Sequence, residues 1–154
     1  MSQAAIVAAF PRLRRAQFFI TSPASNAYNC IAWAAGDTKR VWWPHHPPTF
    51  AYWPPGVERK EELPAFTAVF ATLGYAPCAD GNLEPGFEKL ALFADAQGKP
   101  KHAAKQLPSG KWTSKLGLNE DISHTIYGLG GAEYGDVVQY LKRKIPPRPN
   151  TEKS

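Results

Sequence analysis

One cysteine and one histidine carry the clearest chemical signal in this sequence. Ser25 or Asn26 can cap a helix that contains Cys30 and ends at Gly36, which places the thiol near the helix start. Unpaired N–H groups and the helix dipole at that end lower a thiol pKa and supply donors for an oxyanion. His102 begins a predicted strand, from which an imidazole can act as general base. We therefore expect Cys30 and His102 to form a thiolate–imidazolium pair.

Two further groups of reactive side chains are better interpreted as structural. Cys78 lies in a loop after a long helix, with no capped helix start and no base placed for it. His45 and His46 are adjacent, and adjacent residues rarely point at one ion. No further ligand at suitable spacing completes a site around them. The sequence thus predicts no metal site, and we expect no cofactor.

The elements that must position Cys30 and His102 follow from periodicity. Residues 60–73 place apolar side chains on one helical stripe, and Gly74 ends that helix. Residues 89–94, 102–107 and 111–116 read as three strands with short turns, which predicts an antiparallel meander. Residues 119–129 and 134–143 show helical spacing. The expected fold is α+β, with N-terminal helices packed on a small antiparallel sheet, followed by C-terminal helices.

Two segments suggest a binding surface. Residues 41–55 hold five prolines and five aromatic residues, so they form an ordered excursion or a groove, in which Trp42 and Trp43 could line a substrate cleft. Residues 99–115 carry five lysines around Trp112 and no acid. Such a basic hairpin can neutralise phosphates and stack a base. Solvated lysines and packed aromatic side chains are the simpler interpretation of both segments.

Length and charge limit the class of protein. The chain has 154 residues, enough for one domain over residues 1–145 with a basic, Pro-rich tail at 146–154. Of the net charge of +5, residues 142–154 carry +4, so the rest is nearly neutral. Arg12, Arg14 and Arg15 follow the N-terminal apolar run instead of preceding it, which argues against a Sec signal. We expect a cytoplasmic protein, or one exported without a Sec signal, with no membrane partner.

The segment SNAYNCIAWA, followed by a sheet whose second strand begins with His102, resembles the papain-like cysteine hydrolases of the NlpC and CHAP type. The stretches YNCIAWAAGD, FATLGYAPC, GFEKLALFAD and HAAKQLPSGKWTSKLG also resemble a family of small uncharacterised bacterial proteins. The resemblance implies a papain-like fold with Cys30 as nucleophile and His102 as base. The chain departs from the NlpC pattern at Ile31-Ala32-Trp33, where a small polar or glycine pair is usual.

The resemblance leaves the residue that orients His102 open. Ser114 has a spacing similar to that of the family's orienting residue, while Asp121 and His124 lie just beyond it. Gln106, on the strand of His102 itself, is less favoured. Asn26 or Asn29 would donate to the oxyanion beside the Cys30 amide. Trp33, Trp42, Trp43 and Trp112 complete the expected substrate site.

The sequence therefore predicts a cysteine hydrolase of amide bonds, in the sense of a thiol protease or amidase. A peptide, an isopeptide, a glutamine side chain or a peptidoglycan stem would be its substrate, and a bacterial effector is one setting for it. A protein partner or inhibitor fits the same site. The alternative is a non-catalytic binding module that engages a protein or nucleic acid through residues 99–115 and 41–55. Nucleic acid is the less favoured partner, and the oligomeric state stays open.

Overall fold

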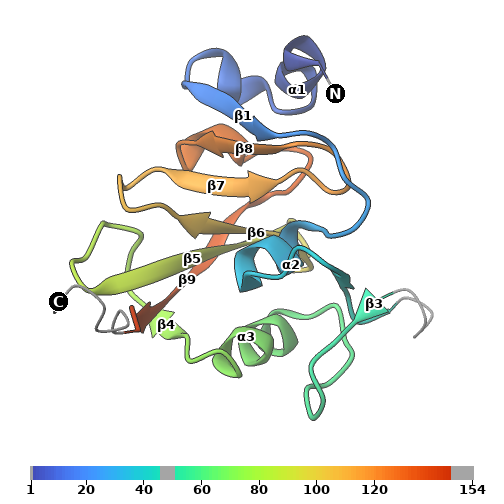
Figure 1. The fold of residues 1–154 in the computed structure, drawn as a ribbon, viewed down its shortest axis with the longest axis vertical. Helices are drawn as coiled ribbons and strands as arrows, with labels where there is room; N and C mark the ends of the chain where they lie inside the picture. Colours follow the sequence, from blue (N-terminus) through green and yellow to red (C-terminus); the bar gives the residue numbers. More distant parts are fainter. Residues whose placement is uncertain (1, 46–50, 147–154) are drawn as a thin grey trace, which may run out of the picture.

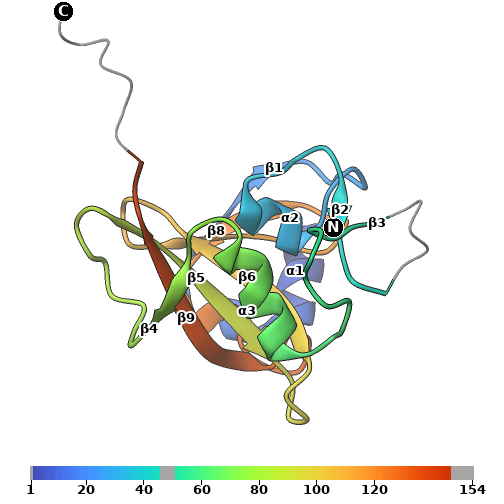
Figure 2. The same ribbon diagram turned by 90° about the horizontal axis from the view of Figure 1, so that it is seen from below.

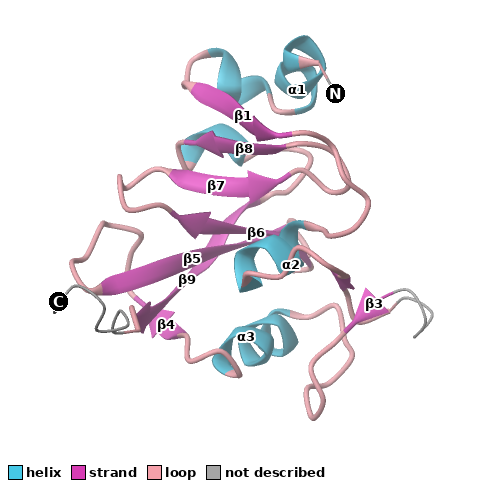
Figure 3. Cartoon of the chain, viewed as in Figure 1, coloured by secondary structure: helices cyan, strands magenta, loops and turns pink. Residues whose placement is uncertain are grey.

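A seven-stranded antiparallel sheet dominates the computed structural model, which describes residues 2–45 and 51–146 (Figures 1 and 3). The strand order is β1-β8-β7-β6-β5-β9-β4, and each neighbouring pair runs antiparallel. The strands span Phe18–Ser22 (β1), Ala76–Cys78 (β4), Phe87–Ala94 (β5), Pro100–Gln106 (β6), Trp112–Lys115 (β7), Asp121–His124 (β8) and Asp136–Lys144 (β9).

The helices are short and lie outside this sheet. The α-helices span Gln3–Ala9 (α1), Cys30–Ala35 (α2) and Leu63–Ala71 (α3), and 3-10 turns cover Pro11–Arg14 (η1) and Tyr127–Leu129 (η2). A separate parallel pair joins Val41–Trp42 (β2) to Ala51–Tyr52 (β3). No helix in the described ranges is long and apolar enough to cross a membrane.

Apolar side chains cover both faces of the sheet, because neighbouring residues of a strand point to opposite sides. Leu90, Leu92 and Ala103 pack in one core cluster with α2 and α3. Phe93 and Ala104, which alternate with them, pack in a second cluster with the N-terminal segment. Figure 2 views the molecule from below relative to Figure 1, with α3 in front. The sheet is therefore a central layer, and its two faces offer separate environments for side chains.

Several expected elements are confirmed. The helix predicted over residues 60–73 appears as α3, and Gly74 follows it with a φ of 93°. The predicted meander appears as β5, β6 and β7, with antiparallel pairing between successive strands. Residues 41–55 hold no helix and only the two-residue strands β2 and β3 in their described part. Turn glycines and dense apolar alternation made these elements predictable from local sequence.

The expected fold class is wrong. The C-terminal helices of the papain-like α+β arrangement do not form: residues 119–129 contain β8 and η2, and residues 134–143 lie largely in β9. Val137, Val138 and Tyr140 are residue types that favour strands. Their spacing fits the period of a helix as well as that of a strand, so periodicity did not decide between the two. β9 pairs with β5 along eight residues and with β4 on its other side. This long-range pairing, invisible to local periodicity, decides the strand.

Strands β6 and β7 pair over a short stretch only. Lys105 lies opposite Thr113 and Gln106 opposite Trp112, whereas the first half of β6 pairs with no strand on that side among the described residues. α2 packs against both strands, and its first residue, Cys30, faces the Ala103 amide of β6. The start of α2 therefore meets β6 where the two strands have separated.

Candidate functional site at the start of helix α2

Cys30 is the first residue of α2 and is almost fully buried, with 6% of its surface exposed. Asn29 caps the helix: its side-chain oxygen accepts the backbone N–H of Ala32 at 3.2 Å. The backbone N–H groups of Cys30, Ile31 and Ala103 face the sulfur and favour its thiolate form. The thiol thus lies at the helix start and faces strand β6, but the cap is Asn29 and not the predicted Ser25 or Asn26, so the helix begins later than expected.

Burial outweighs these donors. Desolvation raises the pKa of the Cys30 thiol to about 11, although the three amides and the nearby Lys115 ammonium act in the opposite direction. Cys30 is consequently a protonated thiol at neutral pH. A thiolate would form here only if a neighbouring base accepted the proton.

Ser114, on β7, lies between two buried histidines on the strands that flank β7: His102 on β6 and His124 on β8. His102 Nε2 lies 2.8 Å from Ser114 Oγ, which lies 2.7 Å from His124 Nε2. His124 Nδ1 lies 2.6 Å from the carbonyl oxygen of Thr125, a group that can only accept. Burial lowers the pKa of His124 to about 4, so the ring is neutral and carries its proton on Nδ1. His124 Nε2 then accepts from the Ser114 hydroxyl, and Ser114 Oγ accepts from His102 Nε2–H.

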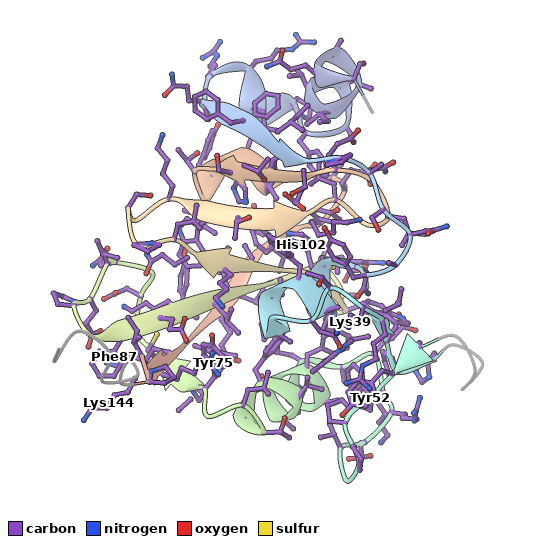
Figure 4. All side chains as sticks on the ribbon, in the orientation of Figure 1. Lys39, Tyr52, Tyr75, Phe87, His102 and Lys144 are labelled. Atoms are coloured by element: carbon purple, nitrogen blue, oxygen red, sulfur yellow. The ribbon has the colours of Figure 1, made fainter. Side chains whose placement is uncertain are left out.

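This chain of hydrogen bonds fixes the tautomer of His102. With its proton on Nε2, the neutral ring presents a bare lone pair at Nδ1, and that atom is buried without a hydrogen-bond partner among the described residues. Burial, followed by the neighbouring His124, lowers the pKa of His102 well below its usual range. The ring stacks on Tyr134 with centroids 4.1 Å apart and packs edge-on against Phe93. Figure 4 marks the position of His102 in the sheet. His102 is therefore an oriented, neutral base.

The structure does not join the thiol to this base. Within the described part of the chain no hydrogen bond connects Cys30 to His102, so the expected pairing stays a prediction. Strand alternation is the reason: Ala103 faces the α2 cluster, whereas His102 points to the opposite face with Phe93. The two groups are nevertheless neighbours, because the Ala103 amide that faces the sulfur belongs to the next residue of β6.

Asp121 belongs to a different polar cluster from His102. Its carboxylate accepts hydrogen bonds from Thr21 Oγ1 and, at 3.0 Å, from Tyr28 Oη, on the α2 side of the sheet. Lys115 donates to the Ser25 carbonyl at 2.7 Å and lies over the Tyr28 ring. Among the three candidates for the orienting residue, only Ser114 contacts His102. His124 continues the hydrogen-bond chain beyond Ser114. His124 lies two residues after the apolar Ile122 on β8, and this alternation could have indicated that both side chains lie on one face of the sheet.

The predicted oxyanion donors, Asn26 and Asn29, do not face the Cys30 sulfur with a free side-chain N–H in the described structure. Both polar atoms of the Asn29 side chain are occupied, since Nδ2 donates to the Trp42 carbonyl and Oδ1 accepts from the Ala32 and Trp42 amides. Asn26 is exposed in the preceding loop. The described hydrogen bonds leave the backbone amides at the α2 start as the donors nearest the sulfur.

The predicted aromatic site residues are largely core residues. Trp42 is buried and donates to Asp37, Trp43 packs on Phe66, and Trp33 donates to Thr113. Trp112 is buried on the face opposite α2, in the cluster of Phe93. Trp33, Trp42 and Trp43 pack in the core on the α2 side of the sheet and Trp112 packs on the other side, so the four do not form one aromatic surface.

The lysines of residues 99–115 do not share one surface. Lys115 is fully buried, whereas Lys99, Lys101 and Lys111 are exposed. Lys105 lies 3.8 Å from the Glu88 carboxylate. This dispersal leaves the nucleic-acid alternative without a continuous basic patch.

The other reactive groups stay apart from this site. His45 lies 3.9 Å from Glu61, and His46 lies outside the described residues, as does the tail from residue 147. Cys78 is half-buried and donates to the Asp80 carbonyl. In the described ranges no three His, Cys, Asp or Glu side chains gather as metal ligands.

Comparison with known proteins places the chain in one family. No curated protein and no solved structure matches the chain. A family model described as a domain of unknown function, DUF7689, matches residues 19–142. The match covers Cys30, His102, Ser114 and His124, together with every strand from β2 to β8. The chain therefore belongs to the DUF7689 family.

Proposed function

We propose that this protein is a cysteine-dependent hydrolase of amide bonds, with Cys30 as nucleophile and His102 as general base. The observation that carries the proposal is the bare, buried lone pair on His102 Nδ1, one residue from the amide that faces the Cys30 sulfur. A buried acceptor without a donor is costly, and a thiol proton is a suitable occupant.

The remaining parts of the site have defined roles in this proposal. Ser114 and His124 hold the imidazole with Nδ1 available, as the orienting residue of a catalytic triad does. The amides at the start of α2 face the sulfur and would also face an oxyanion formed on the carbon it attacks. Transfer of the thiol proton to Nδ1 forms the ion pair, the thiolate attacks the carbonyl, and the imidazolium protonates the leaving amine. Water then hydrolyses the thioester.

One rearrangement is required before the chemistry. The thiol and the imidazole must come within hydrogen-bond distance, and apo sites commonly tighten only around substrate. In the described part of the chain the first half of β6 pairs with no strand on the β7 side, so its backbone can shift without breaking sheet hydrogen bonds there. Displacement of Tyr134 from the His102 ring would open the imidazole to substrate.

Alkylation of Cys30 by iodoacetamide between pH 6 and 11 tests the proposal, with intact-mass detection in a Cys78→Ser background. We expect labelling at pH 7 to fall at least tenfold in His102→Gln and by a smaller factor in Ser114→Ala, since burial alone would leave a thiol of pKa about 11. His45→Gln, at an exposed histidine, is the matched control and should leave the rate unchanged. Circular dichroism confirms that each variant folds.

Substrate assays complete the test. Peptide anilides, glutamine and peptidoglycan stem peptides cover the classes of amide, and product release should disappear in Cys30→Ala. Labelling that rises only toward pH 11 and ignores His102→Gln would make Cys30 a structural thiol and overturn the proposal.

A further inference from the structure

The N-terminal segment covers the face of the sheet on which His102 is buried. This segment, residues 2–15, contains α1 and η1. Its buried apolar side chains pack in the same core cluster as Phe93, which lies edge-on against the His102 ring; they are Ile6, Phe10 and Leu13. In Figure 1, α1 lies above β1 at the top of the view. We refer to residues 2–15 as the N-terminal cover.

Phe10 connects the N-terminal cover to the aromatic ring that lies on His102. The centroids of the Phe10 and Tyr134 rings are 5.0 Å apart, and the Tyr134 ring stacks on the imidazole at 4.1 Å. Burial raises the pKa of the Tyr134 phenol, and a thiolate on Cys30 would raise it further, so the phenol also lies near the sulfur. Tyr134 therefore contacts the cover and lies beside both members of the proposed catalytic pair.

A salt bridge at the surface fastens the N-terminal cover to the loop of Tyr134. Arg12 Nη1 lies 3.0 Å from Oδ1 of Asp136, two residues after Tyr134, and the guanidinium lies 5.1 Å from the centre of the Tyr127 ring. The side chain of Arg12 is 35% exposed and that of Asp136 is 71% exposed. Because water screens such a pair, the fastening is weak and can be released.

The N-terminal cover is attached to the sheet through side chains. The backbone hydrogen bonds of its described residues stay within it, as in the bonds from the Ile6 amide to the Ser2 carbonyl and from the Phe10 amide to the Ile6 carbonyl. It can therefore leave the face of the sheet as a unit without breaking a strand pair. The family match begins at residue 19, so the cover precedes the part of the chain that the family model matches.

We propose that the N-terminal cover inhibits the Cys30–His102 site by holding Tyr134 on the imidazole, and that release of the cover opens the site. This inference rests on the proposed hydrolase function. Release removes the Phe10 ring and the Arg12 side chain from the loop of Tyr134 together, which frees the phenol to leave His102. The cover thus sets the fraction of molecules that can react, and the catalytic pair itself is unchanged.

Arg12→Gln and Asp136→Asn weaken the N-terminal cover from its two sides without altering its buried residues. The matched control is Arg14→Gln, which removes the same charge from an exposed side chain of η1. Iodoacetamide labelling of Cys30 at pH 7 is measured in the full chain with Cys78→Ser. Since an exposed ion pair shifts an equilibrium only a few-fold, we expect labelling to rise about threefold in either variant. The double variant should gain no more than Arg12→Gln alone, and Arg14→Gln should gain nothing.

Hydrogen exchange in the unmodified chain reports the N-terminal cover itself. The amides of Ile6 and Phe10 are hydrogen-bonded within the cover, and a helix as short as α1 does not persist in water once released. These two amides should exchange at least tenfold faster than those of residues 90–93 in β5, and they should speed up in Arg12→Gln by the same factor as the labelling.

The outcomes separate this inference from the proposed function. Labelling that depends on His102→Gln but is equal in Arg12→Gln and Arg14→Gln would overturn the inhibition and leave the hydrolase proposal standing. Labelling that rises in Arg12→Gln but ignores His102→Gln would support release of the cover and overturn the hydrolase proposal. Exchange of Ile6 and Phe10 as slow as that of residues 90–93 would also overturn the inhibition, because the cover would then open only with the whole protein.

Discussion

At the scale of single residues, the relay from Thr125 to His102 defines the site. Its side chains, His124, Ser114 and His102, are neutral and buried, and each hydrogen bond requires the next one to run in the same direction. The relay ends at the Nδ1 lone pair, which is why His102 differs from a histidine that is merely packed in a core. The same burial makes both imidazoles costly to protonate.

The stability of the protein should therefore fall in mild acid. The pKa of His124 drops from 6.5 to about 4 on folding, so the unfolded chain takes up a proton first. The contribution of His124 is complete above about pH 6.5 and is lost as the pH falls through about 4. At 1.4 kcal/mol per pKa unit it is about 3 kcal/mol, of which about 2 kcal/mol is gone at pH 5. His102 shifts in the same direction and adds to the loss.

Urea unfolding at pH 7.5, 6 and 5 measures this loss. His124→Gln should flatten the dependence of the unfolding free energy on pH, and His45→Gln should retain it because His45 is exposed. Equal slopes in the unmodified protein and His124→Gln would show that His124 does not titrate between the two states.

At the scale of elements, the loop between η2 and β9 holds Tyr134 against His102. Gly131 and Gly135 close this loop through an isolated antiparallel bridge, with φ values of 130° and 73°. A Cβ on Gly135 would lie 1.8 Å from the Ala94 carbonyl oxygen at the end of β5. Glycine is required there both for its positive φ and for the close approach of two backbones.

Gly135→Ala should destabilise the protein more than a matched substitution in open space. Gly98 has a similar φ of 80° and no atom within 4 Å of an added Cβ. Gly98→Ala should cost about 1 kcal/mol from backbone conformation, and Gly135→Ala at least about 1 kcal/mol more from the steric clash. Unfolding free energies in urea measure the difference, and equal costs would contradict the close packing of this loop on β5.

At the scale of the whole molecule, β5 is the centre of the structure. β6 and β9 flank it, and its side chains alternate between the two core clusters, with Leu90, Ala91, Leu92 and Phe93 fully buried. β1 and β4 lie at the edges and have a neighbour on one side only. Opening β5 disrupts both cores at once, whereas an edge strand can separate locally.

Hydrogen exchange should reflect this arrangement. Amides of residues 90–93 should exchange most slowly, at a rate set by global unfolding, and the paired amides of β1 and β4 should exchange faster by at least tenfold. Two-dimensional NMR after transfer to D₂O gives both rates in one sample. Protection of β1 equal to that of β5 would mean that its edge is covered, for instance by a second copy.

Local sequence determined those elements whose signals are contained within a few residues. Gly36 ends α2 as expected, although its cap is Asn29 and not Ser25 or Asn26. The apolar stripe of residues 63–71 forms α3, and turn residues separate β5, β6 and β7. Cys30 at a helix start and the spacing of His102 and Ser114 are also readable from the sequence, because one helix and one hairpin fix them. Caps, turns and alternation act over short distances, so they need no tertiary information.

Only the tertiary structure decided the rest. The strand conformation of β9 depends on pairing with β5 and β4, which are distant in the chain. The face on which His102 lies relative to Cys30, the choice of Ser114 and His124 over Asp121, and the high pKa of the thiol all depend on which groups are buried together. Strand pairing and desolvation are properties of the assembled sheet, and no local pattern of residues encodes them.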